Sequence, residues 1–253
     1  LVGILFQGVR IMTDDKPLNG KIILLTGASR GIGRAAAIAC ASAGAELIIT
    51  GRTTGALEEV DDEIKNVGSK STIVELDSTD LPALPRLAKA IHDKWGRLDG
   101  FIANAGQLGQ MSPMPHIEPK AWDETINVNL TAVWHQIRNF DALLRASAAG
   151  RVILMSSAAA VGHRPYWGAY AVSKAGVEAM GRAWAAESEQ TAMKINMIDP
   201  GGTRTGMRAA AFPGEDPLTL PTPEDIAPAF VALMRDDCPY HGELVKARDY
   251  ISS

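Results

Sequence analysis

Three side chains of this sequence, Ser157, Tyr170 and Lys174, have the types and spacing needed to transfer a proton to an oxygen atom. Lys174 follows Tyr170 by four residues in GAYAVSKAG, so a helix there would place both side chains on one face. An ammonium so close favours the phenolate, which predicts a pKa for Tyr170 below the usual value of about 10. Such a phenol could exchange a proton with a carbonyl or alcohol oxygen.

Ser157 precedes Tyr170 by thirteen residues and ends an apolar run, 151–157, that we expect to be a strand. At the end of that strand its hydroxyl could hydrogen-bond the same substrate oxygen and stabilise charge developing there. Ser156 is its neighbour, and one of the two serines could simply satisfy backbone groups. The thirteen-residue spacing favours Ser157.

A glycine-rich segment, residues 26–33 with the sequence TGASRGIG, follows one predicted strand and begins one predicted helix. Gly27, Gly31 and Gly33 permit a tight turn, and the helix N-terminus offers free N–H groups to a pyrophosphate. The other predicted cofactor-binding residues of the segment are Ser29, Arg30 and Ile32. The spacing is GxxxGxG and not GxGxxG, and an ordinary strand–helix connection is the alternative interpretation.

The end of the second predicted strand indicates which coenzyme is preferred. Folds that bind NAD usually carry a carboxylate about twenty residues beyond the glycine loop, where it holds the ribose 2′-hydroxyl. Gly51 stands at that place here, with Arg52 beside it and Arg30 in the loop. Two guanidinium groups could hold a 2′-phosphate, so we expect NADP(H) in preference to NAD(H), which stays possible. The alternative is that both arginines are solvated loop residues.

Short β-rich runs alternate with longer helical patterns along the chain. We expect strands at 21–26, 46–50, 72–76, 98–103, 151–157 and 194–199, and helices at 31–43, 53–67, 81–95, 120–147 and 166–190. Strands that are apolar on both faces belong in a parallel sheet covered by helices. The pattern predicts an α/β fold: one domain over 12–253, with a doubly wound, Rossmann-like parallel sheet of about seven strands and helices on both faces.

Two segments interrupt the alternation. Residues 201–223 hold four prolines and four glycines, and we expect a lid over the substrate, with an ordinary surface excursion as the alternative. Residues 1–11 begin without methionine and include LFQG, which is typical of a cleaved tag; a native extension is the alternative.

Composition excludes several classes of function. With 253 residues, 46% of them hydrophobic and 21% charged, the chain suits one large globular domain. A net charge of −4 argues against a nucleic-acid partner. The two cysteines, Cys40 and Cys238, indicate neither a disulfide framework nor a metal site, and Cys40 is expected in the core. No apolar run reaches the roughly 20 residues of a membrane span, and we expect a cytoplasmic protein.

With these residues in hand, the chain resembles the short-chain dehydrogenase/reductase family from Lys21 to about Val245. The motifs occur in order: TGASRGIG, Asp77, Asn104-Ala-Gly106, Asn129, Ser157, Tyr170-x-x-x-Lys174, and Pro200-Gly201 leading to Thr205. The continuation GGTRTGMRA and the proline-rich loop are similar to a bacterial branch of uncharacterised oxidoreductases in that family.

The resemblance implies a set of cofactor contacts. It assigns Asp77 and Ser78 to the adenine ring, and Asn104, Ala105 and Gly106 to the cofactor-lining turn. It assigns Lys174 to the nicotinamide ribose beside Tyr170, and Thr203 and Thr205 to the carboxamide and pyrophosphate, with Pro200 and Gly201 as further cofactor-binding residues. It also assigns Asn129 to a water-linked proton path from Lys174. A solvated helix residue is the alternative for Asn129, and Asn127 is a nearby competitor.

The residues and the resemblance together predict an NADP(H)-dependent oxidoreductase that interconverts a ketone or aldehyde and an alcohol, with Tyr170 as general acid/base. The substrate region would be mostly apolar, with Leu108, Met111, Val161, His163, Trp167, Met207 and Phe212, and with Arg164, Arg204 and Arg208 as the available cations. We expect a homodimer or homotetramer. The alternatives are a non-catalytic nucleotide-binding regulator or scaffold, and a sugar-nucleotide epimerase or dehydratase, which normally has a larger substrate domain.

Overall fold

The structure, a computed structural model, describes residues 16–162 and 164–251, so the predicted tag remnant and His163 lie outside the described residues. Within them, seven parallel strands form one sheet in the order β3-β2-β1-β4-β5-β6-β7. The strands are β1 (Ile22–Thr26), β2 (Glu46–Gly51), β3 (Ser71–Glu75), β4 (Gly100–Ala103), β5 (Arg151–Met155), β6 (Lys194–Asp199) and β7 (Leu244–Lys246). The predicted Rossmann-like α/β fold is confirmed.

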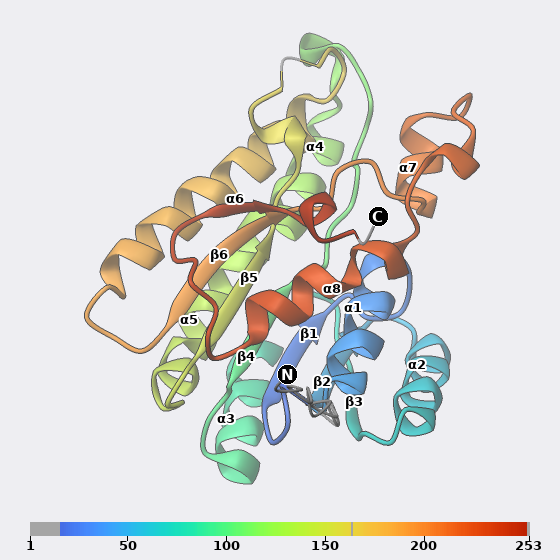
Figure 1. Cartoon of the computed structure of the whole chain (residues 1–253). Helices are drawn as coiled ribbons and strands as arrows, with labels where there is room; N and C mark the ends of the chain where they lie inside the picture. Colours follow the sequence, from blue (N-terminus) through green and yellow to red (C-terminus); the bar gives the residue numbers. More distant parts are fainter. Residues whose placement is uncertain (1–15, 163, 252–253) are drawn as a thin grey trace, which may run out of the picture.

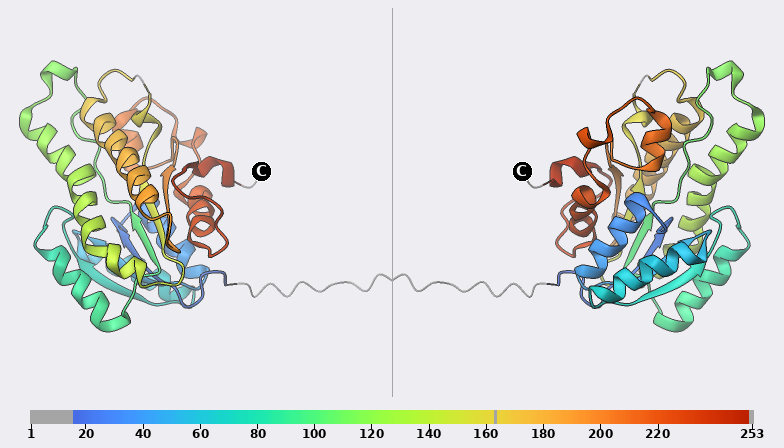
Figure 2. Two further views of the ribbon diagram at one scale, coloured as in Figure 1. Left: turned by 90° about the vertical axis from the view of Figure 1, so that its left-hand side faces the viewer. Right: turned by 90° about the vertical axis from the view of Figure 1, so that its right-hand side faces the viewer.

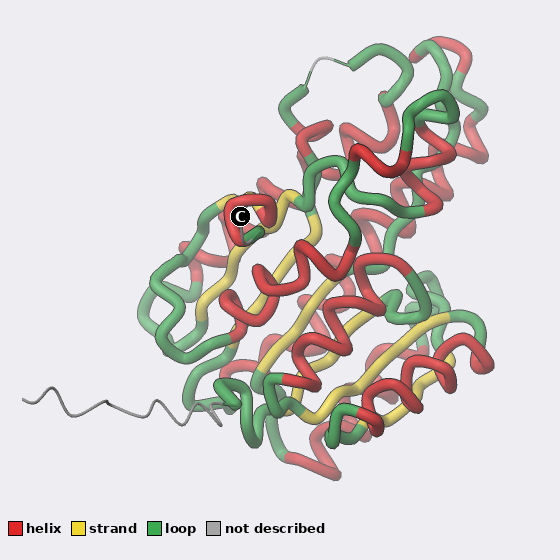
Figure 3. Tube along the Cα trace, turned by 45° about the vertical axis from the view of Figure 1, so that its right-hand side comes forward, coloured by secondary structure: helices red, strands yellow, loops and turns green. Residues whose placement is uncertain are grey.

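Helices cover both faces of this sheet. They are α1 (Gly31–Ser42), α2 (Thr54–Asn66), α3 (Ala83–Trp95), α4 (Pro119–Ile126), α5 (Ala132–Arg145), α6 (Gly168–Glu187), α7 (Gly206–Ala211) and α8 (Pro223–Met234), with short 3₁₀ or π segments at Met114–His116, Asn127–Thr131, Ala158–Ala160, Pro217–Thr219 and Ala247–Tyr250. Helices α1, α2 and α8 lie on one face, and α3, α5 and α6 lie on the other (Figures 1 and 3).

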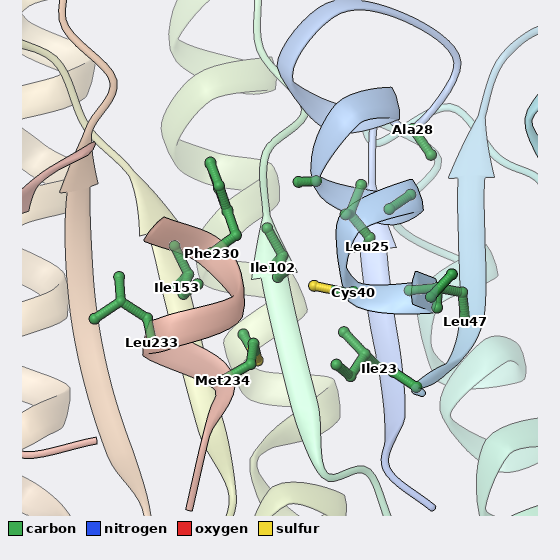
Figure 4. Packing of buried hydrophobic residues seen from close by; sticks show 14 of the residues in the cluster. Ile23, Leu25, Ala28, Cys40, Leu47, Ile102, Ile153, Phe230, Leu233 and Met234 are labelled. Atoms are coloured by element: carbon green, nitrogen blue, oxygen red, sulfur yellow. The ribbon is translucent and has the colours of Figure 1, made fainter. Parts of the chain in front are cut away.

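The core consists of two apolar layers, one on each face of the sheet. Ile23 and Leu25 of β1 point toward α1 and α8, where Phe230 is fully buried (Figure 4). Their neighbours Ile22 and Leu24 point to the opposite layer. Because successive strand residues face opposite sides, a sheet covered on both faces requires apolar residues at every position, as the sequence shows.

All carboxyl ends of the strands meet at one edge of the sheet, because every pairing is parallel. The chain crosses from β3 at one side of the sheet to β4, which pairs with β1 on its other side, so the strand order reverses between β1 and β4. Ligands of open α/β sheets bind outside the carboxyl ends at such a reversal. Helices α4 and α7 stand beyond this same edge (Figures 1 and 2).

Several element boundaries differ from the predictions. The predicted helix 120–147 is two helices, α4 and α5, joined by the π-helical segment Asn127–Thr131. The predicted strand 151–157 ends at Met155, because the chain turns into a short 3₁₀ helix at Ala158–Ala160. The stretch 201–223 is not entirely loop, since Thr205 caps α7 by accepting a hydrogen bond from the Arg208 N–H.

The sequence patterns indicated no bounds for α8 or β7. Helix α8 begins with a capping box, in which the side chains of Thr222 and Asp225 each accept a hydrogen bond from the other's backbone N–H. Pro228 inside the helix is a residue that normally interrupts a helix, so the sequence pattern did not indicate one there. Strand β7 has three residues, too few for a periodic signal. Among the described residues, no helix combines the length and apolar character that a bilayer crossing requires.

The position of Cys40 in the core leads to a first prediction. Burial raises the pKa of its thiol to about 12, so the reactive thiolate is scarce at neutral pH. In a Cys238→Ala variant, a thiol reagent should modify Cys40 only as urea unfolds the protein, with the same midpoint as the circular dichroism signal. Rapid modification without denaturant would contradict this placement.

Candidate active site

Helix α6 carries both Tyr170 and Lys174 on its buried face. The Lys174 Nζ atom donates a hydrogen bond to the Met155 carbonyl oxygen at 2.9 Å and lies 5.7 Å from the centre of the Tyr170 ring. The two side chains are only 9% and 5% exposed, respectively. The predicted four-residue arrangement is therefore present, and it is docked on the last residue of β5.

The pKa of Tyr170 differs from the expectation drawn from its spacing to Lys174. Burial raises this pKa, a hydrogen bond with Ser157 acts in the opposite direction, and the carboxylate of Asp199 adds to the rise. The prediction of a lowered pKa is therefore wrong for this structure. The phenol stays protonated at neutral pH, so it can donate a proton.

The environment of Lys174 explains why its charge does not lower the pKa of Tyr170. Burial lowers the pKa of Lys174 from its ordinary value of 10.5 to about 8, because the ammonium has lost most of its hydration. An amine that titrates near 8 is already neutral before a phenol with a raised pKa ionises. Its charge is thus absent at the pH where it could stabilise the phenolate.

Ser157 lies in the turn between β5 and the 3₁₀ segment, with an extended backbone at φ −167° and ψ 150°. Its hydroxyl oxygen accepts a hydrogen bond from the Ala159 N–H at 3.2 Å, and its side chain is hydrogen-bonded with Tyr170. Ser156 is buried and donates instead to the carboxylate of Glu178 at 2.6 Å. Of the two adjacent serines, Ser157 is the one that meets the phenol.

Asn129 is fully buried in the π-helical segment, which rules out the solvated alternative. Its Oδ1 accepts from the Gln107 N–H and its Nδ2 donates to the Gln107 carbonyl, both at 2.8 Å. Nδ2 also lies 3.1 Å from Ser173 Oγ, whose hydroxyl donates to the Tyr170 carbonyl oxygen. The amide thus ties the loop after β4 to α6, while the competitor Asn127 lines a separate cleft.

The glycine-rich loop has the shape that close approach to a phosphate requires. Gly27 and Gly31 have φ of +70° and +56°, a region that other residues rarely adopt. A Cβ on Gly33 would overlap the carbonyl oxygen of Gly27. Asn104 holds the loop by donating its amide to the carbonyl oxygens of Thr26 and Gly27 at 2.9 and 3.0 Å. Ser29 and Ile32 lie partly buried in this loop, and Ile32 lines the central cavity.

The two candidate 2′-phosphate arginines are both exposed, Arg30 at the N-cap of α1 and Arg52 just after β2. Arg52 and Asp77 line the same cleft. Hydrogen bonds from Thr79 lower the pKa of Asp77, and the Arg52 guanidinium contributes to the lowering. Ser78 follows Asp77, partly buried. The residues that follow β2 and β3 therefore lie in one cleft, where the cofactor prediction needs Arg52 and Asp77 to be close together.

The loop after β6 contacts Arg248, a residue that the sequence analysis did not single out. Gly201 has φ of +68°, and a Cβ there would approach Arg248 Nε to 2.6 Å. Arg248, from the C-terminal 3₁₀ segment, donates to the carbonyl oxygen of Gly202. Thr203 is buried and donates to the Pro200 carbonyl at 3.1 Å. The C-terminal segment thus supports the loop that the family resemblance assigned to the cofactor.

One central cavity brings Ser157, Tyr170 and Lys174 together with half of the predicted catalytic and cofactor-binding residues. It is lined by Ile32, Asn104, Gly106, Leu108, Met155, Ser156, Ser157, Trp167, Tyr170, Lys174, Pro200, Gly201, Thr203, Thr205, Met207, Arg208 and Ala211. Arg52, Asp77 and Asn127 line the second cleft, together with Gln107. Met111, Val161 and Phe212, predicted near the substrate, do not line the central cavity. Ala105 donates its N–H to Thr26 Oγ1 at 3.2 Å behind the cavity wall.

Sequence reasoning also missed Thr26, Gln107 and Ser173, which hold the site from behind. Thr26 Oγ1 accepts from the backbone N–H of Asn104 at 3.1 Å. Thr26 was visible as the residue just before the glycine turn and Ser173 as the neighbour of Lys174. No pattern singled out Gln107, because Asn129 binds its backbone and not its side chain.

Known proteins are similar to this chain in sequence and in fold. A model of the family described as short chain dehydrogenase matches residues 21–216. The uncharacterized oxidoreductase YciK of Escherichia coli K12 is 41% identical over 223 residues, which are 87% of this chain and 88% of that protein. The predicted likeness to bacterial oxidoreductases of this kind is confirmed.

Two solved structures carry a coenzyme. A protein of Escherichia coli CFT073, classed as a short chain dehydrogenase and complexed with NADPH, superposes with a TM-score of 0.89 at 39% identity, covering 92% of this chain and 99% of that chain. A protein of the same class from Shigella flexneri, complexed with NADP, gives the same TM-score, identity and coverage.

The lowered pKa of Lys174 predicts how stability depends on pH. Between about 8 and 10.5, the unfolded chain binds a proton on Lys174 that the folded protein does not, so the free energy of unfolding should rise with pH. The rise amounts to roughly 3 kcal/mol at most. A Lys174→Met variant should lack it.

Urea unfolding of both proteins at a series of pH values measures the difference. Identical pH profiles for the wild type and Lys174→Met would show that Lys174 titrates at its ordinary value.

Proposed function

The chain belongs to the short-chain dehydrogenase family, and from this membership and the site geometry we propose that it is an NADP(H)-dependent oxidoreductase that interconverts a carbonyl compound and an alcohol. The observation that carries the proposal is the convergence of Ser157, Tyr170 and Lys174 on one cavity that Ile32 of the glycine-rich loop also lines. The serine and tyrosine hydroxyls are hydrogen-bonded, and the lysine is docked behind the phenol.

The backbone around the cavity fits a dinucleotide. Gly27 and Gly33 allow the loop to pack tightly on itself and on the turn after β4, and Gly31 begins a helix whose N-terminus favours phosphate. Gly51 leaves the end of β2 without a carboxylate, and Arg52 beside it could bind a 2′-phosphate. The NADP and NADPH complexes of the related proteins agree with this preference. When bound, the nicotinamide would supply or accept the hydride.

The chain's own residues would manage the proton. Tyr170, a phenol that is protonated at neutral pH and whose pKa burial raises further, would donate a proton to the substrate oxygen in reduction and recover it in oxidation. Ser157 would hydrogen-bond the same oxygen as charge develops on it. Lys174 would bind the ribose and would carry a proton behind the phenol. Asn129 would hold the loop after β4 in place through its hydrogen bonds to the Gln107 backbone.

We propose a neutral substrate of moderate hydrophobicity. Leu108, Trp167 and Met207 supply apolar wall to the cavity. Two basic residues line the cavity: Lys174 donates to the Met155 carbonyl oxygen, and Arg208 is already paired with both oxygens of Glu215 at 2.6 Å. Paired charge of this kind offers little to an anionic substrate, because the carboxylate would first have to be displaced.

We also propose that residues 201–223 act as a lid. Phe212 lies 5.7 Å from the ring of Trp167, and Trp167 meets the ring of Tyr170 edge-on at 5.6 Å. Arg204 donates to the carbonyl oxygens of Pro217 and Leu220, which keeps the segment compact. These contacts link the segment to the proposed proton donor.

The first test removes the proposed acid. Tyr170→Phe should lower the rate of carbonyl reduction by at least about a hundredfold, because the phenyl ring has no proton to donate. The dissociation constant for NADPH should change little, since the ring and its packing remain. Absorbance of NADPH with a panel of ketones and aldehydes measures turnover, and fluorescence measures binding.

Two results would overturn the proposal. Full activity in Tyr170→Phe would show that another group donates the proton. NADPH binding by the wild-type protein without turnover of any carbonyl in the panel would favour the non-catalytic nucleotide-binding alternative.

The second test concerns the coenzyme. Arg52→Ala should weaken NADPH binding about tenfold or more, because a charge-assisted contact to the 2′-phosphate is lost. NADH lacks that phosphate, so its dissociation constant is the internal control and should not change. Equal effects on both coenzymes, or none on NADPH, would contradict the assignment of Arg52.

A further inference from the structure

A buried carboxylate, Glu178, stands behind the site without a role in the chemistry described above. Tyr170, Lys174 and Glu178 follow one another at four-residue intervals on α6, so each occupies the same buried face one turn after the last. Glu178 is 2% exposed, and its Oε1 accepts a hydrogen bond from Ser156 Oγ at 2.6 Å. Its Oε2 faces Arg182, whose side chain is half exposed.

Ser156 is held from two directions at the carboxyl end of β5. Its backbone N–H donates to the Ile198 carbonyl of β6 at 2.8 Å, and its hydroxyl donates to Glu178 on α6. A buried hydroxyl and a buried carboxylate each lose free energy when left unpaired, so this contact is strongly favoured. The next residue, Ser157, leaves this anchored point in an extended conformation toward Tyr170.

We propose that Glu178 is a positioning residue that sets Ser157 against Tyr170 by anchoring Ser156 to α6. The inference rests on the proposed function, in which Ser157 and Tyr170 bind one substrate oxygen. These two hydroxyls come from different elements, a turn after β5 and the start of α6. The Ser156–Glu178 bond fastens that turn to the helix that carries Tyr170, so one rigid helix sets the position of both hydroxyls.

The kinetic test uses Ser156→Ala and Glu178→Leu, which both remove the anchor. Each should lower kcat about tenfold, because small displacements of a reacting group are costly, while KM and the NADPH dissociation constant stay unchanged. Glu178→Gln keeps an oxygen that accepts from Ser156, so it should restore most of the lost kcat relative to Glu178→Leu.

A second measurement needs no turnover and therefore separates this inference from the proposed function. The Ser157 hydrogen bond counteracts the rise in the pKa of Tyr170, so its loss should raise that pKa further. Nuclear magnetic resonance of isotope-labelled tyrosine follows the titration, and Tyr170→Phe identifies the signal. Ser156→Ala should move the Tyr170 titration to higher pH, and Glu178→Gln should leave it near that of the wild type.

The chain offers a matched control at the opposite edge of the sheet. Ser147 is buried and donates to the buried carboxylate of Asp99 at 2.6 Å, the same kind of contact as Ser156 with Glu178. Ser147→Ala should lower stability to a similar extent while leaving kcat and the Tyr170 titration unchanged.

If Ser156→Ala and Glu178→Leu behave like Ser147→Ala, losing stability alone, the contact only stabilises the fold and the inference is wrong. If the wild type turns over no carbonyl, the proposed function fails, but the Tyr170 titration still decides the positioning role.

Discussion

The hydrogen bond from Lys174 to the Met155 carbonyl joins the helix that carries the phenol to the strand that leads to the serine. Helix α6 and strand β5 meet at this point, and the rest of the site is arranged around their contact. Lys174 makes this bond in a buried position, where its ammonium loses most of its hydration and keeps one backbone acceptor. This loss of hydration lowers the pKa of Lys174. A lysine held in this way has a fixed position relative to the phenol one turn earlier.

The same burial determines what the phenol can do. A neighbouring cation lowers a pKa only where it is charged at the pH of the titration, and Lys174 loses its proton first. Tyr170 therefore stays protonated at neutral pH, hydrogen-bonded with Ser157, in a cavity whose walls are largely apolar. The polar groups behind it are paired: Asn129 with the Gln107 backbone, Ser156 with Glu178, and Asn104 with the glycine loop. Each of these pairs joins segments that are distant in the chain.

Most of the sheet could be predicted because its strands are apolar on both faces and its helices end at glycines such as Gly44, Gly68 and Gly96. The elements that escaped prediction lack such signals. Helix α8 contains Pro228, β7 is three residues long, and the π-helical segment at Asn127–Thr131 carries Asn129, which is hydrogen-bonded across the site to the Gln107 backbone. Local periodicity cannot report a contact with a residue 22 positions away.

The sequence by itself determined the parallel α/β architecture, the glycine-rich turn, and the helical spacing of Tyr170 and Lys174, because these follow from local periodicity and backbone conformation. It also distinguished Ser157 from Ser156 by spacing alone. Only the tertiary structure decided the direction of the Tyr170 pKa, the docking of Lys174 on Met155 and the burial of Glu178 beneath Ser156. The reason is physical: a pKa depends on hydration and on neighbouring charges, and both are set by which distant segments the fold brings together.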